Sequence, residues 1–367
     1  MEFDIFFLLF VYLILVGCYV NKRRKVTKTT LLCLGPVLVQ ALRSPVCGLD
    51  VWRNGFGGYY QSYSEINAIP LKSIFTAEVH SYEQGYVIYN KLLSFISDNP
   101  QFLLAATSII IFSLIGYIYY KYSENVFLST IIFVCFGLYV FSFSGLRQAI
   151  AFSITFFSFR FIIKRQLVHF LVSVFIAFTI HSSAIIFVFV WPLWNIRHTN
   201  KLSLILLAVT IFALPFYSMI FSFIVPLLFR EKYLIYMNGT TAINLLLIYV
   251  FIYILPILLK TNDFSISDDQ YKDDLKYKIE NFIRWMAYFS FLFQSLGTLG
   301  GDSITRIAFY FSVFLPLYIP LIFKKAKLGN RDMIYTCITL LFIAFFYYDS
   351  APENYNIIPY KFFWELF

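Results

Sequence analysis

Charged residues are scarce in this chain. Only 13% of its 367 residues are Asp, Glu, Lys or Arg, whereas 60% are hydrophobic. A soluble chain of this length would form about two or three domains and would need far more charge to cover their surfaces. Apolar runs close to membrane-spanning length recur along the sequence instead. The composition therefore predicts an all-α polytopic membrane protein.

Cysteine pairs with metal-binding or redox spacing are also missing. The five cysteines include no Cys-x-x-Cys, and most of them fall within apolar runs. We interpret them as small buried hydrophobic residues. His181 is isolated in the sequence from other plausible zinc ligands. We therefore expect neither a metal nor another cofactor.

The signature motifs of several enzyme classes are absent. The sequence contains no P-loop, no His-Glu-x-x-His, no Gly-x-Ser-x-Gly, and no Gly-x-Gly-x-x-Gly after a predicted strand. It also shows no internal repeat, so an inverted-repeat transporter has no positive support. The net charge of +9 could suit nucleic acid, but the basic residues lie in short clusters between apolar runs. Because this spacing is typical of residues that orient membrane helices, we expect no nucleic-acid partner.

The apolar runs predict about twelve transmembrane helices. We expect them at residues 3–20, 29–43, 101–120, 126–143, 148–163, 167–180, 183–195, 202–222, 242–259, 282–298, 304–323 and 333–348. Residues 167–195 also fit one long tilted helix, so the helix count between 167 and 229 stays open. A basic cluster follows the first run instead of preceding it. Residues 3–20 are therefore predicted to be a true transmembrane helix with its N-terminus outside, not a cleaved signal.

This orientation agrees with the distribution of basic residues. The loops predicted to lie inside carry more than twice as many of them as the outer segments, as the positive-inside rule requires. We expect one integral membrane domain, 1–367, with three segments outside the bilayer. These are a large outer loop at 44–100 with an amphipathic stretch at 83–96, a charged inner loop at 260–280, and an outer tail at 349–367.

Four polar residues lie at the predicted outer ends of apolar runs: Arg43, Arg147, Arg306 and His181. A charge at mid-membrane costs roughly 2.5–3.5 kcal/mol on insertion scales, and such groups usually face a cavity or a partner. A single arginine could equally extend its charge to the interface. Several arginines on one side favour an anion, and diphosphate suits the planar guanidinium fork. Glycines precede Arg147 and Arg306, each near the start of a helix, which also favours a bound phosphate.

Acidic residues on the same predicted side include Asp50 and Glu83. Either could act as a general base toward a hydroxyl group, or could simply pair with an arginine. The aromatic segments around residues 51–63 and 355–365 could stack on sugar rings. Anchoring at the membrane interface explains each single ring equally well.

The stretch "FSGLRQAIAFSITFFSFRFIIKRQLVHFLVSVFIAFTIHSSAIIF", residues 143–187, closely resembles the core signature of the EpsG-like family. These are bacterial inner-membrane proteins of exopolysaccharide clusters, grouped with Wzy-type O-antigen polymerases. Four further segments are similar to the family's motifs in the same order: "LRSPVCGLDVW", "YEQGYVIYNKLLSFISDNPQF", "ITRIAFYFSVFLPLYIP" and "NIIPYKFFWE". Leu49 stands where the family pattern leads us to expect threonine before Asp50.

The resemblance implies a helical, lipid-carrier-dependent glycosyltransferase. It would join undecaprenyl-diphosphate-linked oligosaccharide repeat units at the periplasmic face of the inner membrane, and a chain-length-regulating co-polymerase could act with it. We expect Arg147, Arg306 and Arg43 to bind diphosphate, and His181 to act as base, with Asp50 or Glu83 as alternatives. The residues expected to position sugar or phosphate are Gln148, Tyr310, Tyr360 and Lys361. A flippase for the same lipid-linked sugar and an O-antigen ligase are the competing interpretations.

Overall fold

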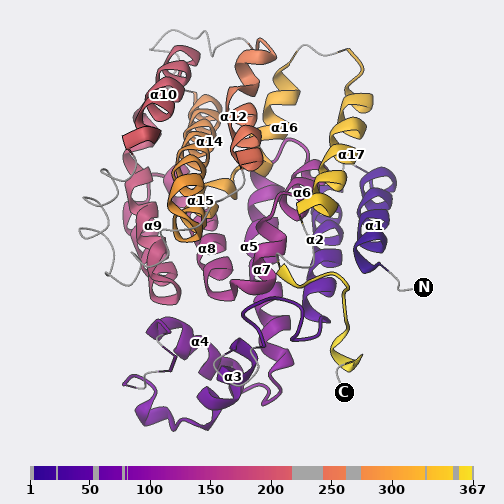
Figure 1. The fold of residues 1–367 in the computed structure, drawn as a ribbon, viewed down its shortest axis with the longest axis vertical. Helices are drawn as coiled ribbons and strands as arrows, with labels where there is room; N and C mark the ends of the chain where they lie inside the picture. The colour runs from indigo at the N-terminus through magenta and orange to yellow at the C-terminus, as the bar shows by residue number, and fades with distance from the viewer. Residues whose placement is uncertain are drawn as a thin grey trace. The chain divides into compact units, whose positions relative to one another are not determined.

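The computed structural model describes residues 4–21, 24–52, 58–76, 79–80, 82–216, 243–261, 274–326, 329–349 and 355–365 (Figure 1). Regular structure within these residues is helical, apart from an isolated bridge between Arg43 and Phe362. The chain divides into two compact units. Unit 1 combines Met1–Ile185 with Asn330–Phe367, and unit 2 is Ile186–Gly329. The all-helical fold expected from the sequence is confirmed for the described part of the chain.

The apolar helices of unit 1 follow the predicted spans. They are α1 (Ile5–Tyr19), α2 (Lys25–Ala41), α5 (Gln101–Tyr122), α6 (Val126–Cys135), α7 (Leu138–Ser144), α8 (Leu146–Ile163), α9 (Leu167–Ile180) and α17 (Arg331–Asp349). Helix α2 packs against α1 and α5, α8 packs against α5 and α9, and α17 packs against α6. Helix α8 therefore has two apolar helices, α5 and α9, as packing neighbours.

Three helices are long and apolar enough to cross a membrane by themselves: Gln101–Tyr122, Leu146–Ile163 and Arg331–Tyr348. Two bent helix pairs raise this number to five among the described residues. Other apolar helices are shorter. For example, α1 has 15 residues and is about 22 Å long at 1.5 Å per residue, less than the hydrocarbon core of about 30 Å. The structure therefore supports a helical membrane protein, while twelve crossings stay a prediction.

The span predicted at 126–143 is broken. Helices α6 and α7 meet at an angle of 50°. Gly137 lies at the break with φ of 79°, in the left-handed region that favours glycine. Asn125 caps the start of α6 by accepting a hydrogen bond from the backbone of Leu128. Because α7 ends at Ser144, α8 can start directly after Gly145, and Arg147 lies in its first turn.

Residues 44–100 contain a small folded layer. Helices α3 (Tyr59–Ala68) and α4 (Gln84–Ser94), with the short η1 (Leu71–Ser73) between them, lie beyond one end of the long helices of unit 1 (Figure 1). Its core consists of apolar side chains, with Ile66, Ile74, Val79 and Val87 all buried. Helix α4 also packs against α9. This contact attaches the layer to the apolar helices.

Unit 2 contains the second set of helices. They are η2 (Ser182–Asn195, which begins in unit 1), α10 (Asn200–Ala213), η3 (Leu214–Phe216), α12 (Ile243–Leu258), α14 (Leu275–Gly300), α15 (Asp302–Ser312) and α16 (Leu315–Lys325). Gly301, with φ of 78°, joins α14 to α15, which pack together. Helices α15 and α16 meet at 49°, so the span predicted at 304–323 is also bent.

A buried polar network joins the elements of unit 2. Arg284 on α14 is only 3% exposed and donates hydrogen bonds to the side chains of Asn200 and Ser203 at the start of α10. The His198 ring lies 3.0 Å from the Ser203 hydroxyl and 3.1 Å from that of Tyr253 on α12. Buried polar groups of this kind need partners, and here they connect three helices.

Some sequence predictions fall outside the described residues. These are the end of the span at 202–222, residues 262–273 of the charged loop, and parts of the tail at 350–354 and 366–367. The interpretation of the cysteines is correct for Cys47 and Cys135, which are buried, and wrong for Cys18 and Cys337, which are exposed. The latter two lie on the outward faces of α1 and α17, which no other described element covers.

Replacement of Gly85 by alanine is expected to destabilise the protein. A Cβ at this position would lie 2.6 Å from the carbonyl oxygen of Thr179 on α9, in addition to meeting the threonine hydroxyl. Since backbone cannot move aside as a side chain can, we expect a cost of about 1–3 kcal/mol. Thermal unfolding in detergent measures it. Gly329→Ala is the control, because a Cβ there meets nothing within 4 Å. Equal melting temperatures for the two variants would contradict the α4–α9 contact.

Candidate functional site

Arg147 and Glu83 form an ion pair across 64 positions of the sequence. The Nη1 group of Arg147, in the first turn of α8, donates to Oε2 of Glu83, the residue that precedes α4. The two side chains are 21% and 20% exposed. A pair sheltered to this degree is screened less by salt than one on an open surface. The ion pair therefore holds the folded layer of residues 44–100 against the start of α8.

The second oxygen of Glu83 faces the end of α9. Its Oε1 lies 3.5 Å from Nδ1 of His181 and accepts a hydrogen bond of 3.0 Å from the backbone N–H of Ser182. Helix α9 ends at Ile180, and His181 has an extended backbone with φ of −152°. One carboxylate thus contacts both an arginine and a histidine that the sequence analysis selected independently.

The pKa of Glu83 lies well below its usual range. Burial alone would raise this pKa, but it is outweighed by the close approach of His181, the positive charge of Arg147 and the N–H of Ser182. Glu83 is therefore ionised at neutral pH and accepts protons poorly. Its geometry is suited to holding Arg147 and His181 in place.

Three tyrosines surround the guanidinium group of Arg147. Its central carbon lies 4.5 Å from the ring centre of Tyr82 and 5.9 Å from that of Tyr59, and its Nε donates to the Tyr59 hydroxyl at 3.4 Å. Tyr86 packs edge-on against both rings. Burial, the nearby Tyr59 and the charge of Asp50 outweigh the hydrogen bond with Ser62 and the charge of Arg147 and raise the pKa of Tyr82 to about 12, so its hydroxyl keeps its proton.

Asp50 reaches this cluster through a sharp turn. Gly48 has φ of 113°, and the backbone N–H of Leu49 donates to the Ser144 hydroxyl at 2.9 Å. A Cβ on Gly48 would collide with the carbonyl oxygen of Phe143, so the loop approaches the end of α7 closely. The carbonyl of Asp50 then accepts the first N–H of α3, from Tyr59. The structure thus brings four predicted residues into one region: Arg147, Glu83, His181 and Asp50.

Arg43 occupies a different environment. It lies just beyond α2, is 0% exposed, and stacks on the ring of Phe143 with 4.4 Å between the guanidinium carbon and the ring centre. Tyr360 and Lys361 lie beside it in the C-terminal segment. The Tyr360 hydroxyl donates to the carbonyl of Val39 at 2.7 Å, while the side chain of Lys361 is exposed.

The remaining predicted site residues are Arg306, Tyr310 and Gln148. Arg306 and Tyr310 are on α15 of unit 2, where Arg306 is exposed and Tyr310 is fully buried. Gln148 follows Arg147 on α8 and is 3% exposed, inside unit 1.

Sequence reasoning missed Tyr82 and the backbone N–H of Ser182. Tyr82 directly precedes Glu83, and that adjacency was the only available signal for its role. The N–H of Ser182 is available to Glu83 because the chain leaves the helix at His181. A backbone donor of this kind has no signature in side-chain patterns.

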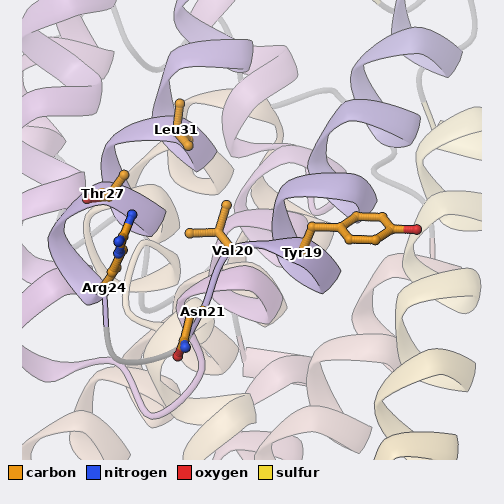
Figure 2. Close-up of a pocket in the computed structure, with 6 residues that line it drawn as sticks. All are labelled: Tyr19, Val20, Asn21, Arg24, Thr27 and Leu31. Carbon is orange, nitrogen blue, oxygen red and sulfur yellow. The ribbon is translucent and has the colours of Figure 1, made fainter.

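A hollow elsewhere in unit 1 is separate from this cluster. It has a volume of about 490 Å³ and lies at the turn between α1 and α2 (Figure 2), lined by Tyr19, Val20, Asn21, Arg24, Thr27 and Leu31. The turn precedes α2, whereas Arg43 follows it, so the hollow and Arg43 lie at opposite ends of this 17-residue helix. The polar cluster, and not the hollow, is therefore the candidate site.

Substitution of Glu83 by glutamine is expected to destabilise the protein in a pH-dependent way. The folded-state pKa of Glu83 is lowered, so its contribution is complete above the ordinary glutamate pKa of about 4.3 and declines as pH falls below it. We expect Glu83→Gln to cost about 1–3 kcal/mol at pH 7 and less at pH 4. Melting temperatures across this range measure the difference. Glu65→Gln, on the exposed pair with His80, is the control. A pH-independent difference would contradict the assignment.

Comparison with known proteins identifies the family to which the chain belongs. The sequence profile of the EpsG family matches residues 32–362, nearly the whole chain, and includes every residue of the polar cluster. No curated protein and no solved structure matches the chain. The EpsG resemblance seen in the sequence is thus confirmed. With its apolar helices and this match, the chain belongs to the EpsG family and is a polysaccharide-related membrane protein.

Proposed function

We propose that this protein is a polysaccharide polymerase of the Wzy type in the bacterial inner membrane. It would join undecaprenyl-diphosphate-linked oligosaccharide repeat units at the periplasmic face, in lipopolysaccharide or exopolysaccharide biosynthesis. The observation that carries this proposal is the position of Glu83 between Arg147 and His181. A cation suited to diphosphate and a base suited to a sugar hydroxyl then lie on either side of one carboxylate.

The proposed reaction is a direct displacement at the anomeric carbon. A hydroxyl oxygen of the terminal sugar on the acceptor unit forms the new glycosidic bond, and the bond between the anomeric carbon and the donor diphosphate breaks. The hydroxyl proton passes to His181, and undecaprenyl diphosphate leaves. Atoms and charges balance without a nucleotide sugar.

Arg147 is the proposed ligand of the donor diphosphate. Its Nε and Nη1 are held by Tyr59 and Glu83, whereas its Nη2 makes no hydrogen bond with the residues that the structure describes. A guanidinium held in this way can stabilise the charge that develops on the leaving group without reorganising. Arg43, and Arg306 on α15 of unit 2, are each proposed to bind a phosphate or diphosphate group.

Glu83 is proposed to act as a positioning residue. Its contact with Nδ1 of His181 would keep a proton on that nitrogen, stabilise the imidazolium that forms, and leave Nε2 to accept the proton from the acceptor. Asp50 is the alternative base because it lies in the same region. Gln148, Tyr310, Tyr360 and Lys361 are proposed to position sugar or phosphate, directly or through their neighbours.

A flippase and a ligase are the competing functions. A flippase would move lipid-linked units across the bilayer without changing chain length, and a ligase would transfer finished chains to a different acceptor. A deletion strain that makes single-repeat lipopolysaccharide selects the polymerase. A strain that makes no capped lipopolysaccharide selects the ligase.

Arg147→Ala is expected to abolish the polysaccharide ladder in cells that lack the native copy. Arg147→Lys should retain less than about a tenth of wild-type polymer, because an ammonium group cannot reproduce the bidentate fork. Ladders on gels, at protein levels matched by immunoblot, measure the effect. Lys72→Gln, an exposed residue of η1, controls for loss of one positive charge. Wild-type ladders from both Arg147 variants would overturn the diphosphate role.

His181→Gln is expected to lower the elongation rate by about 100-fold or more. Initial rates in membrane vesicles, measured with labelled lipid-linked units at matched protein levels, give this quantity. If the variant elongated chains at the wild-type rate, another residue such as Asp50 would be the base.

A further inference from the structure

Arg43 is a buried cation with no anionic partner among the residues that the structure describes. Its Nε, Nη1 and Nη2 atoms are all inaccessible, and none of them has a hydrogen-bond partner among these residues. The guanidinium group lies over the ring of Phe143. Burying a charge without hydrogen bonds is costly, and the attraction of a ring face offsets only part of that cost. Arg147 also lies over aromatic rings, but it is partly exposed and paired with Glu83.

The C-terminal segment Tyr360–Glu365 covers Arg43. The backbone N–H of Ser44 donates to the carbonyl of Lys361 at 2.8 Å, and that of Phe363 donates to Leu42 at 3.0 Å. Arg43 and Phe362 form the antiparallel bridge between these bonds. Figure 1 shows this segment, in yellow, beside the end of α2. The cover is therefore a short main-chain pairing placed directly on the residue that lacks a partner.

The segment has few apolar anchors beyond Tyr360. The side chains of Lys361, Phe363 and Glu365 are exposed, and Trp364 is 58% exposed. Separation of the segment from residues 42–44 would break a few main-chain hydrogen bonds and the bond from the Tyr360 hydroxyl to the carbonyl of Val39, each of which contributes only modestly to stability. It would also allow water or a ligand to reach the guanidinium group. Because the lost hydrogen bonds and the regained solvation of the charge oppose each other, a modest binding energy can shift the equilibrium between the closed and the open segment.

We propose that Tyr360–Glu365 is a lid over a second anion-binding site, whose cation is Arg43 and whose ligand is a phosphate or diphosphate group. A phosphate group can reach the guanidinium only after the lid has moved, because Arg43 is fully covered. The ligand therefore binds the open form alone and increases its population. The assignment of the ligand to a lipid-linked diphosphate rests on the proposed function. Free diphosphate offers the same chemistry.

Cys47 is a natural reporter of this lid. It is 1% exposed, and its Sγ lies 3.4 Å from the backbone nitrogen of Lys361. Burial raises the pKa of its thiol despite the nearby Arg43, so the closed form reacts slowly with maleimides. Movement of the segment would expose the thiol to water and accelerate its reaction.

The experiment uses the full chain with Cys47 as its one cysteine, after replacement of Cys18, Cys33, Cys135 and Cys337 by serine. Maleimide labelling in detergent is timed without ligand, with inorganic diphosphate, and with a polyprenyl diphosphate. We expect diphosphate to raise the labelling rate at least fivefold, and Arg43→Gln to abolish this response. A response to the polyprenyl form alone assigns the site to the lipid carrier, and a response to both assigns it to diphosphate in general.

Two results would overturn the proposal. One is a labelling rate that no diphosphate changes, and the other is an Arg43→Gln protein that responds as the parent does. A second protein with Cys135 as its one cysteine reports general unfolding, because that thiol is 1% exposed on α6. Its labelling should stay slow, and an equal rise there would count against a lid.

The labelling experiment does not depend on polymerase activity. A missing response in a protein that still elongates chains refutes the lid alone, and a response without elongation refutes only the polymerase.

Discussion

The ionised carboxylate of Glu83 is the interaction on which the candidate site depends. Its two oxygens contact Arg147 on α8 and the His181–Ser182 segment after α9. Without this carboxylate, a half-buried guanidinium would face three tyrosine rings alone, and the layer formed by α3 and α4 would lose its polar attachment to the apolar helices. The close α4–α9 approach at Gly85 places Glu83 where it can make these contacts.

The two arginines of unit 1 show how neighbours decide the behaviour of the same side chain. Arg147 has a carboxylate, a tyrosine hydroxyl and 21% exposure, so it stays charged and accessible. Arg43 has an aromatic ring and a main-chain cover but no hydrogen-bond acceptor within the described part of the chain. The first arrangement leaves the guanidinium group partly accessible, whereas the second covers it completely.

Sequence reasoning selected several residues of the candidate site but not their arrangement. Arg147, Glu83 and His181 could be selected because each is an unusual residue type beside an apolar run. Their contacts depend on pairings over 64 to 99 positions, which local periodicity does not encode. The same holds for Arg43, whose cover comes from residues more than 300 positions away. The break at Gly137 was also missed, since hydropathy continues across it while the backbone turns by 50°.

The most direct test of the account is elongation by the purified protein. The protein is reconstituted into vesicles with lipid-linked repeat units as its one sugar substrate, and chain length and released undecaprenyl diphosphate are measured together. The account predicts chains of increasing length, with one undecaprenyl diphosphate released for each new linkage. Units that cross the bilayer or persist unchanged, with no linkage formed and no diphosphate released, would contradict it.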